Sequence, residues 1–78
     1  MPIIFSKHAK EMLKQRQIKQ ILAKNCAYSP DYILPGQENK KIYLKDFGNN
    51  FLKLIVAEEG DDKIIITLYW LAKKRVKL

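Results

Sequence analysis

The side chains that could carry out chemistry are few in this 78-residue chain. His8 is the only histidine, and imidazole is the side chain that most readily exchanges a proton near neutral pH, so a general acid or base role falls to it first. It lies at the margin of the apolar stripe predicted for the first helix, and its neighbours Lys7 and Lys10 would attract a phosphate. A boundary histidine without a chemical role is the alternative.

Arg16 is the second candidate, because it is predicted to end the first helix. Its guanidinium could bond the last carbonyls of that helix, or it could hold a phosphate through its planar fork. Cys26 has no nearby histidine and is interpreted as a small buried apolar residue. One cysteine and one histidine cannot complete a zinc site. With no glycine-rich phosphate loop, paired carboxylates or serine triad either, we expect no metal or cofactor.

The net charge of +7 comes from 15 basic and 8 acidic residues, and the excess lies towards the two ends of the chain. Residues 7–24 hold six basic side chains against Glu11, and the last six residues include Lys73, Lys74 and Arg75. If these segments meet, they form a cationic surface suited to a polyanion. A solvated set of lysines that keeps the protein soluble is the alternative.

The pattern of apolar residues predicts an α+β fold in a single domain over residues 1–78. Ser6 is a good N-cap for a first helix, and the apolar period restarts at Ile18 for a second one. These two N-terminal helices should pack on one face of an antiparallel sheet of three to four strands. The predicted helices span about 6–16 and 18–25, and the predicted strands are a short edge at 2–5, a short piece at 32–34, and a meander of 40–47, 51–58 and 63–71.

The turn Gly48-Asn49-Asn50 reads as a three-residue hairpin loop, which sets the predicted register. It places Phe47 opposite Phe51 and Lys45 opposite Lys53. Lysines that face each other repel, unless an anion lies between them, and adjacent aromatic rings could stack on bases. The uncovered face is therefore predicted to carry a lysine row and an aromatic row. Snorkelling lysines with a few exposed rings are the alternative. The residues assigned to this face include Lys41, Tyr43, Lys45, Lys53, Phe47, Phe51 and Tyr69.

The run Phe5-Ser6-Lys7-His8-Ala9, followed by Met12, Arg16 and Ile18, resembles the start of a prokaryotic family known as domain of unknown function 4258. The apolar strand 52–56, the acidic turn after it and the strand 64–69 resemble the rest of that pattern, so the resemblance covers nearly the whole chain. Gln17 stands where the family often has glycine, which predicts a different turn between the helices.

This family is similar in layout to the RelE- and ParE-type toxins of toxin–antitoxin pairs, and the RelE kind cleave RNA. The resemblance implies a RelE-like domain that cleaves RNA without a metal, by attack of a ribose 2′-hydroxyl on the adjacent phosphate. His8 would then be the general acid or base, Arg16 would hold the transition state, and Tyr69 would assist. The backbone of the RNA would be held by Lys45, Lys53, Lys73, Lys74 and Arg75.

We therefore expect an RNA-binding toxin with endoribonuclease activity, whose partners are RNA, including ribosome-bound mRNA, and a small acidic antitoxin protein. We expect a monomer or weak dimer. We expect it in the cytoplasm, because the opening residues lack a signal-peptide layout and no apolar run approaches the ~20 residues of a membrane helix. The alternatives are a toxin that has lost its activity, a non-catalytic nucleic-acid-binding module, and a protein-interaction module.

Overall fold

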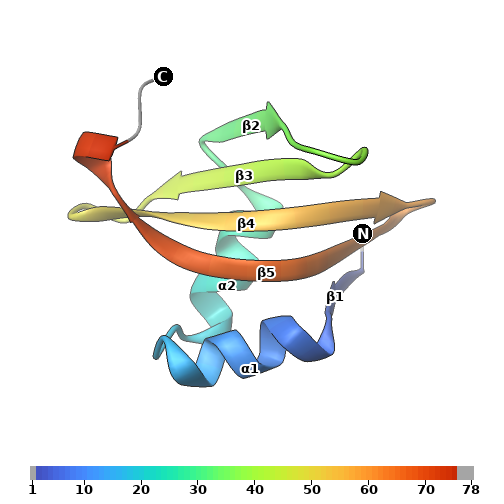
Figure 1. Cartoon of the computed structure of the whole chain (residues 1–78), viewed down its shortest axis with the longest axis horizontal. Helices are drawn as coiled ribbons and strands as arrows, with labels where there is room; N and C mark the ends of the chain where they lie inside the picture. The colour runs from blue at the N-terminus through green and yellow to red at the C-terminus, as the bar shows by residue number, and fades with distance from the viewer. Residues whose placement is uncertain (1, 76–78) are drawn as a thin grey trace.

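A computed structural model describes residues 2–75 and the side chains of residues 2–74, over which the chain forms two helices beside one five-stranded sheet (Figure 1). The strand order across the sheet is β1-β5-β4-β3-β2. The elements in chain order are β1 (Ile3–Phe5), α1 (Lys7–Gln15), α2 (Gln20–Tyr28), β2 (Tyr32–Pro35), β3 (Lys41–Asp46), β4 (Asn50–Glu59), β5 (Asp62–Ala72) and the 3₁₀ turn η1 (Lys73–Arg75).

The prediction of three to four antiparallel strands was wrong, because the sheet is mixed and has five strands. β1 pairs in parallel with β5, with Ile3 beside Lys63 and Phe5 beside Ile65. Its ends are fixed by backbone bonds from Ser6 N–H to Ile65 O (3.0 Å) and from Lys63 N–H to Pro2 O (3.0 Å). Two strands joined by a hairpin are recognisable from the turn residues between them. The parallel pairing of β1 with β5 joins segments about 60 residues apart and has no such turn to indicate it.

The start of α1 is the predicted one. Ser6 is the N-cap, and its hydroxyl oxygen accepts from the Ala9 N–H at 3.0 Å. The same hydroxyl donates to the carbonyl of Ile66 at 2.8 Å, so the cap also ties the helix to β5. The N-cap prediction is confirmed, and the described helix ends one residue before the predicted limit.

α1 ends in a turn that normally favours glycine. The Ile18 N–H reaches Leu13 O (2.9 Å) and the Gln17 N–H reaches Lys14 O (3.3 Å), which is the Schellman pattern. Gln17 occupies the left-handed position of this turn with φ 52°, and the following Ile18 is buried. The chain therefore makes a glycine-type turn with glutamine, and Arg16 sits at its start.

The two helices lie against different strands. α1 runs along β5 and β1, whereas α2 lies behind β3 and β4 (Figure 1). Both contribute to one core, since Ala9 and Met12 of α1 and Ala23 and Cys26 of α2 join the buried residues of the sheet. Cys26 is 0% exposed, which confirms it as a buried residue, and this burial raises the pKa of its thiol to about 12.

The predicted register between β3 and β4 was wrong by one residue. Asp46, not Phe47, lies opposite Phe51. Gly48 takes φ +100°, and its N–H donates to the Asp46 carboxylate at 2.7 Å. A slip of one residue exchanges the two faces of a strand, so Lys45 lies opposite Leu52 rather than Lys53. The predicted row of facing lysines does not exist.

β4 and β5 also pair differently from the prediction, because Glu58 rather than Ala57 lies opposite Lys63 beside the turn, and the ladder shifts by one more residue between Ile55 and Val56. At this bulge Ile65 lies buried in the core, and the two shifts together bring Lys53 beside Tyr69 instead of Thr67. In the observed register, Lys45 lies on the face of the sheet that is covered by α2, whereas Lys53 lies on the opposite face beside Tyr69.

The face away from α2 is partly closed at one end. Leu44 is 2% exposed and Phe51 is 7% exposed on this face, although neither belongs to the main core cluster. The Tyr32 ring packs edge-on against Phe51 with 6.1 Å between centroids, and Lys73 Nζ lies 5.8 Å from the Phe51 ring. The predicted aromatic row is therefore also wrong, because Phe47 packs on Trp70 at 6.0 Å.

Both described helices have nine residues, and neither is long and apolar enough to cross a membrane.

Candidate nucleic-acid interface

The accessible part of the face away from α2 centres on Tyr69 of β5. The Arg16 Cζ lies 5.3 Å from the centre of the Tyr69 ring, and the Lys53 Nζ lies 5.2 Å from the same point. Both distances are within the range of cation–π contacts. These three half-buried or exposed residues come from α1, β4 and β5, and we call them the Tyr69 cluster. Among the described site residues predicted from the sequence, these three are the ones that contact one another.

Arg16 is the C-cap of α1, and its side chain extends from there towards the Tyr69 ring. Its Nε donates to the Met12 sulfur at 3.4 Å, one helical turn earlier, and its backbone N–H is used by Met12 O. In the described part of the chain, its guanidinium bonds no carbonyl of α1 and no carboxylate. Of the two roles open to Arg16, the carbonyl-capping one is therefore not taken.

The Tyr69 cluster concentrates positive charge. Since both cations lie close to the same ring centre, Arg16 Cζ and Lys53 Nζ can be no more than 10.5 Å apart. At that separation their repulsion is about 0.4 kcal/mol in a water-like dielectric and about 1.6 kcal/mol near a protein surface. A phosphate placed between them would add two attractions, which together outweigh this repulsion. Tyr69 supplies the aromatic ring of the cluster on which a base could stack.

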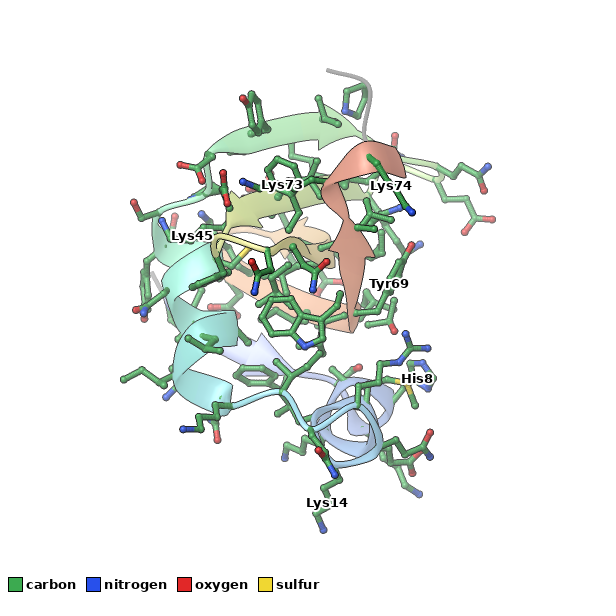
Figure 2. The ribbon with its side chains drawn as sticks, turned by 90° about the vertical axis from the view of Figure 1, so that its left-hand side faces the viewer. His8, Lys14, Lys45, Tyr69, Lys73 and Lys74 are labelled. Atoms are coloured by element: carbon green, nitrogen blue, oxygen red, sulfur yellow. The ribbon has the colours of Figure 1, made fainter. Side chains whose placement is uncertain are left out.

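His8 lies on the same side of the molecule as Tyr69, at the start of α1 (Figure 2). Its side chain is exposed. The eight residues from His8 to Arg16 correspond to about 12 Å of rise along a helix. His8 therefore lies on the same side of the molecule as the Tyr69 cluster but outside it.

Three of the predicted binding residues have structural roles on the helix side instead. Lys45 Nζ donates to the Ser29 carbonyl at 2.7 Å, just past the end of α2. Figure 2 shows Lys45 on the opposite side of the molecule from Tyr69. The last carbonyls of a helix lack partners inside the helix and attract cations, so Lys45 stabilises the end of α2.

Lys41 and Tyr43 meet at Glu58. The Lys41 ammonium lies 2.7 Å from one oxygen of this carboxylate, and the Tyr43 hydroxyl donates to the other at 2.9 Å. These hydrogen bonds, with that of Lys41 the stronger, lower the pKa of Glu58. Burial, followed by the bond to Glu58, raises the pKa of Tyr43 to about 12. Lys63 completes the group, with its ammonium 4.9 Å from the Tyr43 ring.

The basic segment after β5 is only partly available to a ligand. Lys73 Nζ forms an ion pair with Asp46 at 2.7 Å, and this bond, followed by that from Gly48 N–H, lowers the pKa of Asp46. Lys74 is exposed, and Figure 2 places it on the same side of the molecule as Tyr69. The side chain of Arg75 lies outside the described residues.

A hollow next to the Tyr69 cluster was not predicted. It has a volume of about 590 Å³ and lies between the β2–β3 turn and the middle of β3 and β4, with Lys53 in its wall. The pair Pro35-Gly36 is typical of a turn, but nothing in the pattern of residues indicates that this turn lies beside an accessible sheet face.

The comparisons place the chain in a family without naming an activity. A family profile described as "Domain of unknown function (DUF4258)" matches residues 5–70, a stretch that contains His8 and the whole Tyr69 cluster but not the basic segment after β5. Neither the curated proteins nor the solved structures give a significant match. Since the profile covers well over half of the chain, the protein belongs to the family Domain of unknown function (DUF4258).

Proposed function

We propose that this protein binds single-stranded RNA through the Tyr69 cluster. The observation that supports this is the convergence of two cations on one accessible tyrosine ring. In this arrangement a base stacks on Tyr69, and Arg16 and Lys53 hold the flanking phosphates. A single strand fits the cluster better than a duplex does, because the bases of a duplex are stacked on each other and unavailable to the ring.

Binding can be tested with a labelled single-stranded 12-mer and the matched duplex by fluorescence anisotropy. Loss of a stacking ring costs about 1–3 kcal/mol per base, so Tyr69→Leu is expected to weaken binding by about 5- to 150-fold. Tyr28→Leu is the matched control, because Tyr28 is an exposed tyrosine at the end of α2. Equal effects of the two substitutions, or no binding by the wild type, would contradict the proposal.

The proposal includes cleavage of the kind made by RelE-type toxins, which is supported by the position of His8 on the same side of the molecule as the cluster. In this reaction the imidazole of His8 takes the proton of a ribose 2′-hydroxyl, the oxygen attacks the adjacent phosphorus, and the 5′-oxygen leaves with a proton. The products are a 2′,3′-cyclic phosphate and a 5′-hydroxyl. Given about 12 Å along α1, the scissile phosphate near His8 is a different one from that held by Arg16.

Cleavage is tested separately from binding. End-labelled RNA is incubated with the wild type and with His8→Ala in the presence of a chelator, and bacterial growth is followed on expression of each. The toxin interpretation expects wild-type cleavage and growth arrest, both lost in His8→Ala, and a small acidic antitoxin that reverses the arrest. Binding without cleavage or arrest would leave a non-catalytic RNA-binding module.

A protein-interaction surface is the second candidate, and a different observation favours it. Ile21 and Tyr28 of α2 are 65% and 61% exposed, and their spacing of seven residues puts them on one side of the helix. Ile33 of β2 is 51% exposed as well. Light scattering at rising protein concentration tests self-association. A dimer that Ile21→Lys abolishes would support this surface, whereas a monomer at all concentrations would count against a second copy as the partner.

A further inference from the structure

The hollow beside the Tyr69 cluster has an apolar floor and a polar rim. Its floor includes Ile42 and Ile55, which lie directly opposite each other on β3 and β4 and are both half-buried. Its rim is the β2–β3 turn, including Gln37, Glu38 and Lys40. A volume of about 590 Å³ is in the range of small-ligand pockets, so the hollow can accept a planar group such as a nucleobase.

The hollow and the Tyr69 cluster are continuous. Lys53 lines the hollow, and its ammonium is 5.2 Å from the Tyr69 ring. Along β4, Lys53 and Ile55 are two residues apart, so their side chains emerge on the same face about 7 Å from each other. Lys53 pairs with Tyr69 in the sheet, which makes Tyr69 a diagonal neighbour of the floor. A strand stacked on Tyr69 can therefore place a neighbouring base over Ile55.

The rim is held in place by the backbone of the turn. The Gly36 N–H donates to Lys40 O at 2.9 Å, and the Lys40 N–H donates to Gln37 O at 3.0 Å. A Cβ added at Gly36 would lie 2.8 Å from Lys40 O, so the turn is closed tightly. Glu38 takes the left-handed φ of 54° inside this turn, and its carboxylate is held 3.3 Å from the Lys40 ammonium.

Glu38 gives the rim its chemical character. A carboxylate has room for about four hydrogen bonds, so one contact with Lys40 leaves it able to accept from a base. The donors that bases offer to carboxylates are exocyclic amino groups, such as N4 of cytosine. Uracil has the carbonyl oxygen O4 where cytosine has this amino group, and two acceptors that face each other repel, so the ring N3–H is the one donor that uracil keeps on this edge.

We propose that the hollow between the β2–β3 turn and the Ile42–Ile55 pair is a nucleobase subsite that prefers a base with an exocyclic amino group over uracil. This inference rests on the proposed RNA binding by the Tyr69 cluster, and it adds base selectivity to it. The base lies on the two isoleucines, its amino group donates to Glu38, and Lys53 holds the phosphate that links it to the base on Tyr69.

The test compares hexacytidylate with hexauridylate by fluorescence anisotropy. The wild type is expected to bind hexacytidylate at least about 5-fold more tightly, the lower end of discrimination for a good base contact. Glu38→Ala is expected to bring the two affinities within about 2-fold without weakening hexauridylate. The Glu38 side chain is 85% exposed, so this substitution leaves the fold intact. Glu11→Ala on exposed α1 removes the same charge and should keep the preference.

The site is located by amide chemical shifts on addition of hexacytidylate. We expect changes at Gly36, Ile42 and Ile55 in the wild type, which shrink in Glu38→Ala. Equal affinity for the two hexamers, or a preference that survives Glu38→Ala, overturns the subsite but leaves binding at Tyr69 standing. If neither hexamer binds, the proposed function fails and the subsite fails with it.

Discussion

Lys53 and Lys45 form a matched pair for testing which face of the sheet meets RNA. Both are half-buried lysines in the central strands, but Lys53 points at Tyr69 whereas Lys45 is bonded to the Ser29 carbonyl on the helix side. Each is replaced by methionine, which keeps most of the side-chain length and removes the charge. Lys53→Met should weaken RNA binding, and Lys45→Met should weaken the fold.

The size of the binding effect follows from counterion release. One phosphate contact on a single strand contributes about 0.7 to the slope of log affinity against log salt. The wild type therefore binds RNA more tightly than Lys53→Met, and the ratio of the two affinities should shrink as salt is added. Between 50 and 200 mM salt this ratio is expected to fall by about 2.6-fold. Lys45→Met is expected to leave the slope unchanged, because its ammonium is directed at the end of α2.

The size of the stability effect follows from the bond to Ser29. A net contribution of about 1 kcal/mol from this exposed hydrogen bond with a charged donor corresponds to a drop of about 4–8 °C in the melting temperature of a domain of this size. Lys53→Met loses only an accessible cation–π contact, worth about 0.5–1 kcal/mol. The assays are anisotropy titrations at three salt concentrations and thermal unfolding by circular dichroism. If Lys45→Met lowered the salt slope as much as Lys53→Met, the assignment of faces would be refuted.

Three further predictions concern the fold that carries the site. Gln17→Gly is expected to raise the free energy of unfolding in urea by up to about 1 kcal/mol, because glycine adopts the left-handed φ without strain; lower stability would contradict the described turn. The buried Cys26 thiol should not react with a thiol reagent at pH 8 until the protein is unfolded, and immediate labelling would show that it is accessible. The lowered pKa of Glu58 adds stability that is present above its unfolded pKa, near 4.5, and is lost as the pH falls through the lower folded value. Melting temperatures between pH 5 and pH 3 should therefore fall more steeply for the wild type than for Glu58→Gln, and parallel curves would count against this carboxylate.

Local features of the fold could be predicted from the sequence. Ser6 was identified as an N-cap because its hydroxyl and the apolar period that follows are both local signals, and the structure confirms it. Cys26 was predicted to be buried from its type and position, which is also confirmed. The family was predicted from the run around His8 and is confirmed by the profile match. Each of these inferences uses residues that are close together along the chain.

Strand register could not be predicted in the same way. The residues around Gly48 are compatible with two registers, the predicted one with Phe47 opposite Phe51 and the observed one with Asp46 opposite Phe51. Which of the two forms depends on the conformation of Gly48 and on how the strands pack. The Tyr69 cluster depends on this register, on the bulge at Ile55 and on the turn after α1. The family resemblance placed Arg16 and Tyr69 in one site, but their direct contact spans 53 positions of the chain and only the fold reveals it.

The parallel pairing of β1 with β5 has a consequence for how the molecule is made. The bond from Ser6 to Ile66 spans 60 positions of the sequence, so the first strand has no partner strand until the first half of β5 has left the ribosome. Contacts of such high sequence separation slow folding, because a long loop must be closed before they form. The nascent chain would therefore expose the apolar side of α1 for most of its synthesis, and chaperones that bind apolar segments would have a defined interval in which to act.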